Sequence, residues 1–404
     1  MKSQDIPSAE VAIIGLGYVG LPLFALFSKR YKCVGVDVDQ QKIEHINKEY
    51  AYVSKSNNNS CKVTSDWNEI KDADIYIITV PTPINDNNEP DLTPLTQACE
   101  GIGKCLSMGN IVVLESTVYP GATEELCSPI LEKESGLKCN IDFFIAYSPE
   151  RVNVGDKEHS INRVPKIVAG STSYTTSIIS RLYQSVIDTD VVIASSIKVA
   201  EAAKMYENVQ RDVMIALANE YSEFCRSEQI DIFEVTRCAS SKWNFMNVSP
   251  GLVGGHCISV DPYYLLNRAK EKHQTLPLVK TAREINEIKP LIVAKRICEL
   301  ANEVDSERLS ILLLGFSYKP NTSDFRNTKV ADVIRYLNDN KIDVDCFDPL
   351  VDEDKVMSQF GIHVINDKKQ LAKSYGLIVK MVNHDLFEGF SLGNASIIEI
   401  SDLL

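Results

Sequence analysis

Short apolar runs alternate with more polar stretches over the first half of the chain. The apolar runs have the length of strands and lie at 11–15, 33–37, 75–80, 111–115 and 143–147. The stretches between them are helical in pattern, beginning with a helix at about 18–30. Strands that alternate with helices indicate a parallel, doubly wound sheet. We expect this first α/β domain to occupy residues 1–195.

The pattern changes between residues 196 and 304. A helical stretch at 197–225 contains neither Gly nor Pro, and a second one at about 276–304 is interrupted by Pro290. Between them lies an irregular segment dense in Gly and Pro, SPGLVGGHCISVDPYYL. We expect a central helical segment that joins two domains or forms a dimer interface, and the sequence does not separate these roles.

The last part of the chain, residues 305–404, returns to the first pattern. Apolar runs at 309–314, 344–347, 377–382 and 397–400 accompany a predicted helix at 330–338. The predicted fold class is therefore α/β, with two Rossmann-like parallel-sheet domains joined by a long central helical segment.

The composition argues against two classes of partner. Of 404 residues, 42 are basic and 55 acidic, which gives a net charge of −13. Nucleic acids and anionic membranes both require a basic footprint, so we expect neither as a partner. The uncharged run at 11–27 contains Gly15, Gly17, Gly20 and Pro22, and we interpret it as a strand, a turn and a helix start rather than a membrane span.

The cysteines bear on location and on metal binding. The chain has 11 cysteines and no Cys-x-x-Cys pair. This usage favours free thiols in a reducing cytosol over a disulfide framework. We expect a cytoplasmic protein without a bound metal.

Gly15, Gly17 and Gly20 form a GxGxxG pattern between the first strand and the first helix. Such glycines permit a tight turn, let the backbone approach a pyrophosphate and let helix and strand pack closely. Asp37 follows about 20 residues later at the end of the next strand, where it would bind ribose hydroxyls and disfavour a 2′-phosphate. We predict an NAD site with Lys42 beside the ribose, the alternative being a similar turn that binds nothing. The later strand that ends at Gly315 lacks the pattern, so we expect no second dinucleotide there.

Several segments carry candidate chemistry that would be weak evidence if taken alone. Cys257 follows two glycines and precedes Asp261-Pro262, which is typical of an N-cap and a first helical residue. A thiol near a helix N-terminus gains thiolate character, although a buried structural cysteine is the alternative. Lys204 and Asn208 share one face of the long helix and could stabilise an oxyanion, or they could simply be solvated.

Three further segments follow predicted strands, where ligands of this fold bind. They are Glu115 to Gly121 with Thr117, Ser148 to Arg151 with Glu150, and the loop Lys319 to Arg326. The last one places two cations on a loop and is a candidate anion site. Turn chemistry and a solvated charged loop are the alternatives.

Taken together, these motifs resemble the UDP-glucose/UDP-N-acetylhexosamine 6-dehydrogenase family over nearly the whole chain. The matching segments are, in order, GLGYVGLP, VPTP, ESTVYPG, YSPER, EAAKMYEN, GGHCISVDP and KPNTSDFRNTK. The resemblance implies a four-electron oxidation of a sugar C6 alcohol with two NAD, through a thiohemiacetal and a thioester on Cys257. It also implies a homodimer or higher homo-oligomer.

The resemblance assigns roles to residues of this sequence. It makes Cys257 the nucleophile, lets Lys204 and Asn208 stabilise oxyanions, gives Asp261 the proton transfers, and lets Thr117 and Glu150 order the hydrolytic water. The implied cofactor-binding residues are Gly15, Gly17, Tyr18, Val19, Gly20, Asp37, Lys42, Thr82, Thr117 and Arg326. The implied substrate-binding residues are Glu150, Arg151, Lys204, Asn208, Gly254 and Lys319.

The choice of sugar rests on finer features. GGHC, with His rather than Ser before the nucleophile, resembles the aminosugar branch, so we expect UDP-GlcNAc or UDP-GalNAc, used for surface polysaccharide synthesis. UDP-N-acetylmannosamine and UDP-glucose are the alternatives. Val154 and Ser259 depart from that branch, which often has Pro and Gly there. The arginine that some members lend across the dimer has no clear match, and Arg237 and Lys242 are only candidates.

Two other functions would explain the glycine motif. A two-electron hydroxyacid or hydroxyacyl dehydrogenase needs no cysteine, and a non-catalytic NAD-binding sensor needs none of Lys204, Asn208, Cys257 and Asp261. The number of NADH formed per sugar separates the three readings, because they predict two, one or none.

Overall fold

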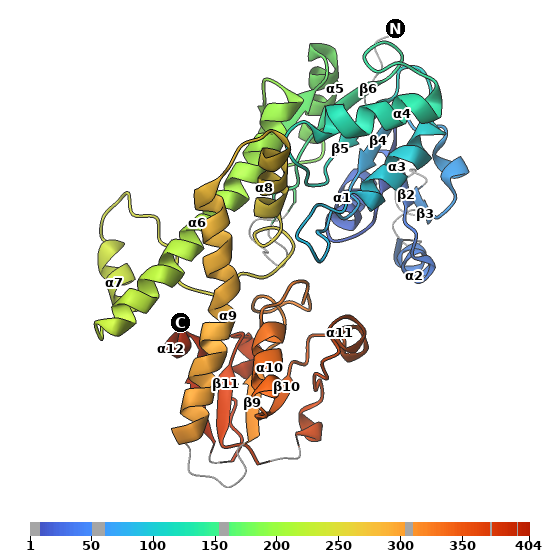
Figure 1. Cartoon of the computed structure of the whole chain (residues 1–404). Coiled ribbons are helices and arrows are strands. Elements are labelled where there is room, and N and C mark those ends of the chain that lie inside the picture. The colour runs from blue at the N-terminus through green and yellow to red at the C-terminus, as the bar shows by residue number, and fades with distance from the viewer. Residues whose placement is uncertain (1–8, 51–60, 153–160, 304–309, 372–373, 394) are drawn as a thin grey trace. The chain divides into compact units, whose positions relative to one another are not determined.

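The structure is a computed structural model that describes residues 9–50, 61–152, 161–303, 310–371, 374–393 and 395–404. It divides into two compact units (Figure 1). Unit 1 comprises Met1–Glu207 and Tyr263–Glu271, and unit 2 comprises Asn208–Pro262 and Lys272–Leu404. The three-part division at 195/196 and 304/305 remains a proposal.

Unit 1 is built on an eight-stranded sheet with the order β3-β2-β1-β4-β5-β6-β7-β8. The strands are β1 (Glu10–Ile14), β2 (Lys32–Val36), β3 (Cys61–Thr64), β4 (Ile75–Ile78), β5 (Ile111–Leu114), β6 (Phe144–Tyr147), β7 (Lys166–Gly170) and β8 (Val191–Ile193). The predicted strands are confirmed to within two residues at each end, whereas β3, β7 and β8 were not predicted.

Side chains alternate between the two faces of this sheet, and both faces are buried. Val11 and Ile13 of β1 belong to one apolar cluster, and Ala12 and Ile14 belong to another on the opposite face. Because both faces are covered there, the central strands β4, β5 and β6 are apolar and buried along their whole length, as in parallel sheets generally. The helices that cover them are α1 (Gly20–Phe27), α2 (Gln40–Tyr50), α3 (Thr93–Gly103), α4 (Ser128–Ser135) and α5 (Ser173–Gln184), and α3 and α4 pack together (Figure 1).

Strand β7 runs antiparallel to β6, while the other strand pairs of this sheet are parallel. Ala146 pairs with Gly170 and Tyr147 with Ala169. The first residue of β7, Lys166, therefore lies at the edge of the sheet where β4, β5 and β6 end.

The helical part of the chain contains α6 (Ile197–Ser227), α7 (Ile232–Ala239), α8 (Asp261–Glu271) and α9 (Pro277–Glu303). Helix α8 begins at Asp261 itself, one residue earlier than the N-cap prediction. Among the helices of the described residues, none has both the length and the apolar character needed to cross a membrane. The described residues also contain no group of three or more His, Cys, Asp or Glu placed to hold a metal ion.

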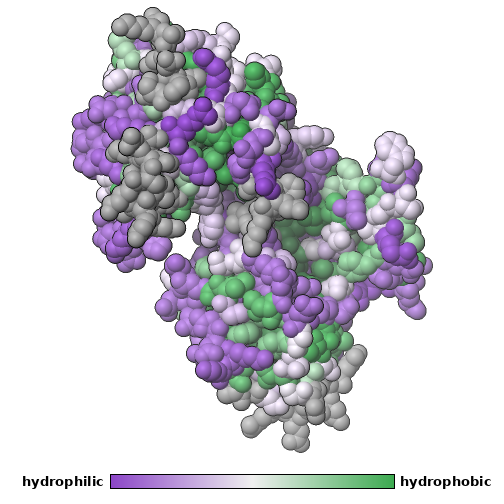
Figure 2. Space-filling model, turned by 180° about the vertical axis from the view of Figure 1, so that it is seen from behind, coloured by the Kyte–Doolittle hydropathy of each residue, from purple (hydrophilic) through white to green (hydrophobic). Residues whose placement is uncertain are grey.

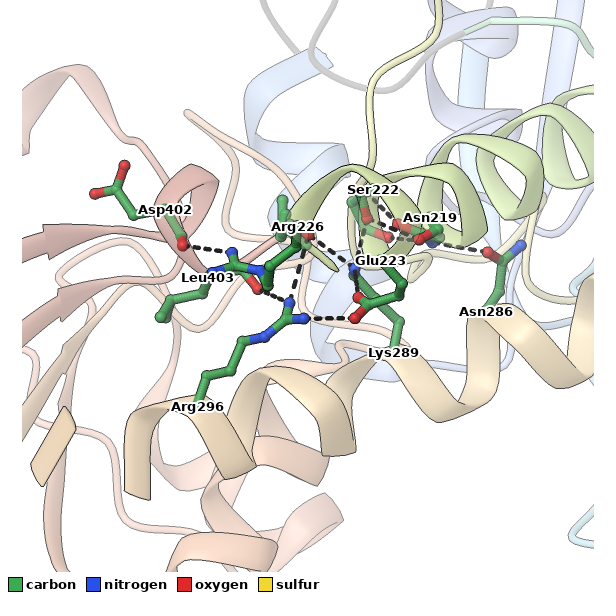
Figure 3. A network of polar contacts seen from close by, with 11 residues as sticks. Asn219, Ser222, Glu223, Arg226, Asn286, Lys289, Arg296, Asp402 and Leu403 are labelled. Carbon is green, nitrogen blue, oxygen red and sulfur yellow. Dashed lines mark hydrogen bonds and ion pairs between the residues drawn. The ribbon is translucent and has the colours of Figure 1, made fainter. Parts of the chain in front are cut away.

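The predicted interruption at Pro290 is wrong, because α9 continues through this residue. A proline inside a helix removes a backbone hydrogen bond and costs about 3 kcal/mol. Polar side chains around Pro290 join α9 to α6 (Figure 3). Asn286 accepts from Asn219 at 2.9 Å, and Lys289 contacts Glu223 at 2.7 Å. Arg296 also contacts Glu223, at 2.5 Å.

Unit 2 contains a four-stranded parallel sheet with the order β10-β9-β11-β12. Its strands are β9 (Ser310–Leu314), β10 (Asp343–Phe347), β11 (Leu377–Lys380) and β12 (Ser396–Glu399), and its helices include α10 (Val330–Asp339), α11 (Glu353–Phe360) and α12 (Ile400–Leu403). Helix α10 packs against α9 (Figure 1). The two α/β parts of the predicted fold class are confirmed.

The first turn of unit 2 repeats that of unit 1 with one difference. Gly315 has a φ of 91°, as Gly15 does. Asp348, at the end of β10, accepts from the N–H groups of Phe316 and Ser317 at 2.7 and 3.1 Å. Its Oδ2 also lies 3.1 Å from His384 Nε2. The carboxylate of Asp348 is therefore enclosed by His384 and by backbone N–H groups.

The network around His384 fixes its hydrogen. Asn321 N–H donates to Nδ1 at 2.8 Å, so in the neutral ring the hydrogen sits on Nε2 and points to Asp348. Burial opposes the ionised form of Asp348. Hydrogen bonds from His384, Phe316 and Leu350 nevertheless lower the pKa of Asp348 below its ordinary value of 3.8.

We expect Asp348→Asn to lower the free energy of unfolding of unit 2 by about 1–3 kcal/mol at pH 7, because buried donors lose a charged acceptor. A carboxyl with a depressed folded pKa contributes stability above its unfolded pKa and loses it as the pH falls through the folded pKa. The difference between variant and wild type should therefore shrink below about pH 4. Calorimetry from pH 3 to 7 measures this, with Asp339→Asn, at the exposed end of α10, as the control. An equal loss at pH 3 and pH 7 would contradict the assignment.

Candidate active site

The glycine turn of unit 1 leaves room where a pyrophosphate would need it. A Cβ on Gly15, at φ +91°, would lie 2.9 Å from the backbone of Val80, and one on Gly20 would lie 1.9 Å from the carbonyl oxygen of Gly15. A Cβ on Gly17 would meet no atom of the described residues within 4 Å. Two glycines therefore allow close packing, and the middle one faces open space. This is the arrangement that a bound dinucleotide requires.

Thr79 also holds this turn, and it was missed by sequence reasoning. Its hydroxyl donates to the carbonyl oxygens of Ile14 and Gly15 at 3.0 and 2.6 Å. The only signal in the sequence is its place directly after β4.

Asp37 is buried and accepts hydrogen bonds from three directions. Its Oδ2 accepts from the N–H of Leu16 and from Lys42 Nζ, both at 2.8 Å, and its Oδ1 accepts from the N–H of Asp39 at 3.0 Å. Burial opposes the charge, but these hydrogen bonds lower the pKa of Asp37. The structure therefore pairs Lys42 with Asp37 and holds an ionised acceptor beside the glycine turn. The predicted place of Lys42 beside the ribose stays a prediction.

Four of the other predicted cofactor residues lie on the same part of unit 1. Tyr18 is exposed in the turn, and Val19 directly precedes α1. Thr82 is buried after β4. Thr117 follows β5 and is half-buried. Contacts of these four with NAD remain predictions.

Glu150 follows β6 and is held by internal donors. Its Oε1 accepts from the N–H groups of Arg151 and Val152, each at 2.7 Å, and its Oε2 lies 3.1 Å from Lys166 Nζ. Arg151 itself pairs with Glu207 of α6 at 2.7 Å. Lys166 was missed in the sequence because no motif contains it.

The start of α6 carries Lys204, which is 5% exposed and therefore not the solvated residue of the alternative reading. One turn earlier, Glu201 is fully buried and accepts from the N–H groups of Gly121 and Thr123 at 2.5 and 2.9 Å. Burial raises the pKa of Glu201. Glu201 thus fixes the loop that contains Thr117 to the helix that contains Lys204, and sequence reasoning did not single it out.

In unit 2, Asn208 and Asp261 form a direct pair. The Asn208 side-chain amide donates to Asp261 Oδ2 at 2.5 Å, and Asp261 is 1% exposed. Cys257 is exposed, and its carbonyl oxygen accepts from the N–H of Asp261 at 2.8 Å. One turn of chain therefore carries the thiol and the carboxylate, and Asn208 contacts the carboxylate. The catalytic roles of the three residues stay predictions.

The two glycines before Cys257 let a loop of unit 2 pack against them. A Cβ on Gly254 would lie 2.8 Å from the carbonyl oxygen of Asn327, and one on Gly255, at φ +82°, would lie 2.8 Å from the ring of Tyr318. Ser259, where the aminosugar branch often has Gly, donates its hydroxyl to the carbonyl oxygen of Gly255 at 2.6 Å. This serine therefore braces the turn. Val154, the other departure, lies outside the described residues.

A pocket of about 230 Å³ lies in unit 2 beside this turn. Gly254, Tyr318, Lys319 and Lys329 are among the residues that line it. The predicted anion-binding lysine therefore faces a cavity of the same unit. Arg326 pairs with Asp324 at 2.7 Å, and its predicted contact with the cofactor remains a prediction.

The chain matches three family models of known proteins. They are the NAD binding domain of the UDP-glucose/GDP-mannose dehydrogenase family at residues 9–187, its central domain at 198–288 and its UDP binding domain at 312–398. NAD is therefore the cofactor of the first of these parts.

Relatives and solved structures agree with this match. The chain is 43% identical to UDP-N-acetyl-D-glucosamine 6-dehydrogenase of Salmonella typhi over 95% of this chain and 92% of the relative, and 42% identical to the enzyme of the same name from Pseudomonas aeruginosa over 95% and 93%. A structure of UDP-D-ManNAc dehydrogenase from Pyrococcus horikoshii superposes with a TM-score of 0.84 at 28% identity, over 96% of this chain and 94% of that one. The glycine turn, the Cys257 turn and these matches lead to one conclusion: the chain belongs to the UDP-glucose/GDP-mannose dehydrogenase family.

Proposed function

We propose that this chain oxidises the C6 alcohol of a UDP-N-acetylhexosamine to a carboxylate, with two NAD reduced for each sugar. The observation that carries the proposal is the Cys257 turn, which combines an exposed thiol with a buried carboxylate held by Asn208. A two-electron dehydrogenase would have no use for that thiol.

The residues around the glycine turn fit NAD. The open space at Gly17 suits the pyrophosphate, and Asp37 offers an ionised acceptor to the ribose hydroxyls. NAD, when bound, accepts one hydride from C6 in each of the two oxidations. Asp37 also repels a 2′-phosphate and thereby excludes NADP.

The proposed role of Cys257 is to keep the aldehyde bound between the two oxidations. Its thiolate adds to the aldehyde carbon and gives a thiohemiacetal, which loses the second hydride to become a thioester. Water then cleaves the C–S bond and regenerates the thiolate. The overall balance is R–CH₂OH + 2 NAD⁺ + H₂O → R–COO⁻ + 2 NADH + 3 H⁺.

In this proposal the other polar residues stabilise developing charge, transfer protons or bind the substrate. Lys204 and Asn208 stabilise the oxyanions that form at C6. Asp261, held by Asn208, takes part in the proton transfers. Thr117 and Glu150 order the hydrolytic water, and Arg151, Gly254 and Lys319 contact the UDP-sugar.

The N-acetylated sugar is supported by the names of the relatives at 43% and 42% identity, which act on UDP-N-acetyl-D-glucosamine. UDP-GalNAc remains in the proposal, and UDP-N-acetylmannosamine and UDP-glucose are the alternatives to be tested. Surface polysaccharide synthesis is the proposed use of the product. We place the reaction in the cytoplasm. Cys33 and Cys61 lie on neighbouring strands with a hydrogen bond between their thiols, and they do not form a disulfide. Cysteines that stay reduced are typical of a reducing compartment.

We also propose a homodimer. Leu217, Tyr221 and Phe224 lie on one face of α6 and are 56%, 46% and 53% exposed. Figure 2 shows that apolar patches are present among the polar side chains of the visible surface. Exposed apolar surface of this kind marks contact sites between proteins. Arg237 and Lys242 stay the candidates for a basic residue that reaches the site of the partner subunit.

Purified protein with NAD and UDP-GlcNAc or UDP-GalNAc should form two NADH per sugar. The Cys257→Ser variant should lose turnover while it keeps its fold, because a hydroxyl is a far weaker nucleophile than a thiolate. Absorbance at the NADH band and circular dichroism measure both. Turnover of UDP-glucose or UDP-ManNAc alone would overturn the choice of sugar, and no NADH from any of the four would overturn the function.

Asp37→Ser should weaken NAD binding about ten- to hundredfold, since charged hydrogen bonds to the ribose are lost. The variant should also have a smaller ratio between the dissociation constants for NADPH and NADH than the wild type. Fluorescence titration with NADH and NADPH measures both dissociation constants, and Asp66→Asn at an exposed turn is the control. Unchanged constants would exclude Asp37 from the site.

Phe224→Glu should convert a dimer to a monomer, because a charge on the α6 face would be buried without a partner. Light scattering during gel filtration gives the mass. Lys280→Glu reverses an exposed charge on α9 and should have the same mass in solution as the wild type. A wild-type protein of monomer mass would rule out the proposed dimer.

A further inference from the structure

Four residues of unit 1 form an enclosed polar cluster that includes Glu150, a predicted water-ordering residue. We call Glu115, Glu150, Lys166 and Tyr183 the Lys166 cluster. The Lys166 side chain is 4% exposed and lies 2.5 Å from Glu115 Oε2 and 3.1 Å from Glu150 Oε2. It also donates to the carbonyl oxygen of Pro149 at 3.3 Å. The Tyr183 hydroxyl donates to the other oxygen of Glu115.

The direction of β7 makes this cluster possible. Glu115 follows β5, Glu150 follows β6, and parallel strands deliver both to one edge of the sheet. Because β7 runs antiparallel to β6, its first residue arrives at that same edge. A parallel β7 would have placed Lys166 at the opposite end of the strands.

The three donors of the Lys166 ammonium are matched by three acceptors, on Glu115, Glu150 and Pro149. Burial opposes the charge on Lys166, but the two carboxylates outweigh it and raise the pKa of Lys166. Burial raises the pKa of Glu115, against the effect of Lys166. Lys166 therefore keeps its proton, and removing it would leave buried carboxyl groups without a counter-charge.

The carboxylate of Glu150 is fixed from both sides. Its Oε1 accepts two backbone N–H groups and its Oε2 accepts from Lys166. A carboxylate has about four acceptor positions, so about one remains on Oε2. A group held in this way is a fixed acceptor for a water molecule, and it has little freedom to swing toward a substrate.

We infer that Lys166 is a positioning residue for the hydrolytic step: it holds the Glu150 carboxylate in place, and Glu115 with Tyr183 holds Lys166. The inference rests on the proposed function, in which Glu150 orders the water that attacks the thioester. That step is R–CO–S–Cys257 + H₂O → R–COO⁻ + Cys257 thiolate + 2 H⁺. The water oxygen bonds to the carbonyl carbon, the C–S bond breaks, and both protons leave for solvent.

The test is Lys166→Met, which keeps the length of the side chain and removes its charge. Hydrolysis should slow about 10- to 100-fold, the usual effect of losing a residue that orients a site group. Both oxidations precede hydrolysis, so a rapid burst of two NADH per Cys257 should precede slow turnover. Intact-protein mass spectrometry after acid quenching should find the uronyl thioester. The KM for the UDP-sugar should change little, and Lys166→Arg should restore part of the rate.

Two comparisons separate positioning from mere stability. Lys289→Met removes another buried lysine, which lies in unit 2 and pairs with Glu223 (Figure 3), and it should lower stability without accumulating the thioester. Glu150→Gln should give the same signature as Lys166→Met, and the double variant should be no slower than Glu150→Gln alone. If Lys166→Met does not fold, Glu115→Gln combined with Lys166→Met removes one charge of each sign and serves in its place.

The inference is overturned if Lys166→Met lowers the rate without thioester accumulation, as a structural lysine would, or if its effect multiplies with that of Glu150→Gln. A wild-type protein that forms no NADH overturns the proposed function instead. In that case the crystal structure of Lys166→Met still decides whether Lys166 positions Glu150. A Glu150 carboxylate that keeps its hydrogen bonds to Arg151 and Val152 refutes the positioning role.

Discussion

A sheet that is buried on both faces leaves only the ends of its strands for polar chemistry. In unit 1 the last residues of β1, β2, β4, β5 and β6 are apolar and belong to one enclosed cluster. The polar residues follow at once: the glycine turn after β1, Asp37 after β2, the Glu115 loop after β5 and Glu150 after β6. Parallel pairing gathers these ends at one edge. The candidate cofactor site is therefore a consequence of how the core is covered.

Sequence reasoning recovered what local patterns encode. Apolar runs located β1, β2, β4, β5 and β6, and a stretch free of Gly and Pro located α6. It failed where partners are distant. Glu201 contacts the N–H of Gly121 across 80 positions, and Lys166 contacts Glu115 across 51. No local pattern signals such pairs, nor the antiparallel direction of β7. Pro290 was misjudged because tertiary contacts of α9 outweighed a local rule. The roles assigned to the site residues came from the family resemblance and remain to be measured.

The two α/β units contain the same kind of glycine turn after their first strand, but the carboxylate beside the turn has a different environment in each unit. In unit 1 the Asp37 carboxylate, which follows β2, pairs with Lys42. It lies near the turn that contains Gly17, where a Cβ would meet open space. In unit 2 the equivalent carboxylate is enclosed by His384 and by backbone N–H groups, and it stabilises the loop that carries Lys319. The carboxylate of unit 1 is thus partly open at Lys42, whereas that of unit 2 is closed by a buried side chain.

The Lys166 cluster also bears on the order in which the chain can fold during synthesis. Glu115 and Glu150 leave the ribosome before Lys166, and Tyr183 follows later still. Until β7 has been made, the edge beyond β5 and β6 would enclose two carboxyl groups with no cation, and that is costly in an apolar interior. The strands from β1 to β6 can assemble early, but the ends that carry Glu115 and Glu150 must stay open to water. These strand ends can therefore become buried only after Lys166 has been synthesised and can pair with the two carboxyl groups.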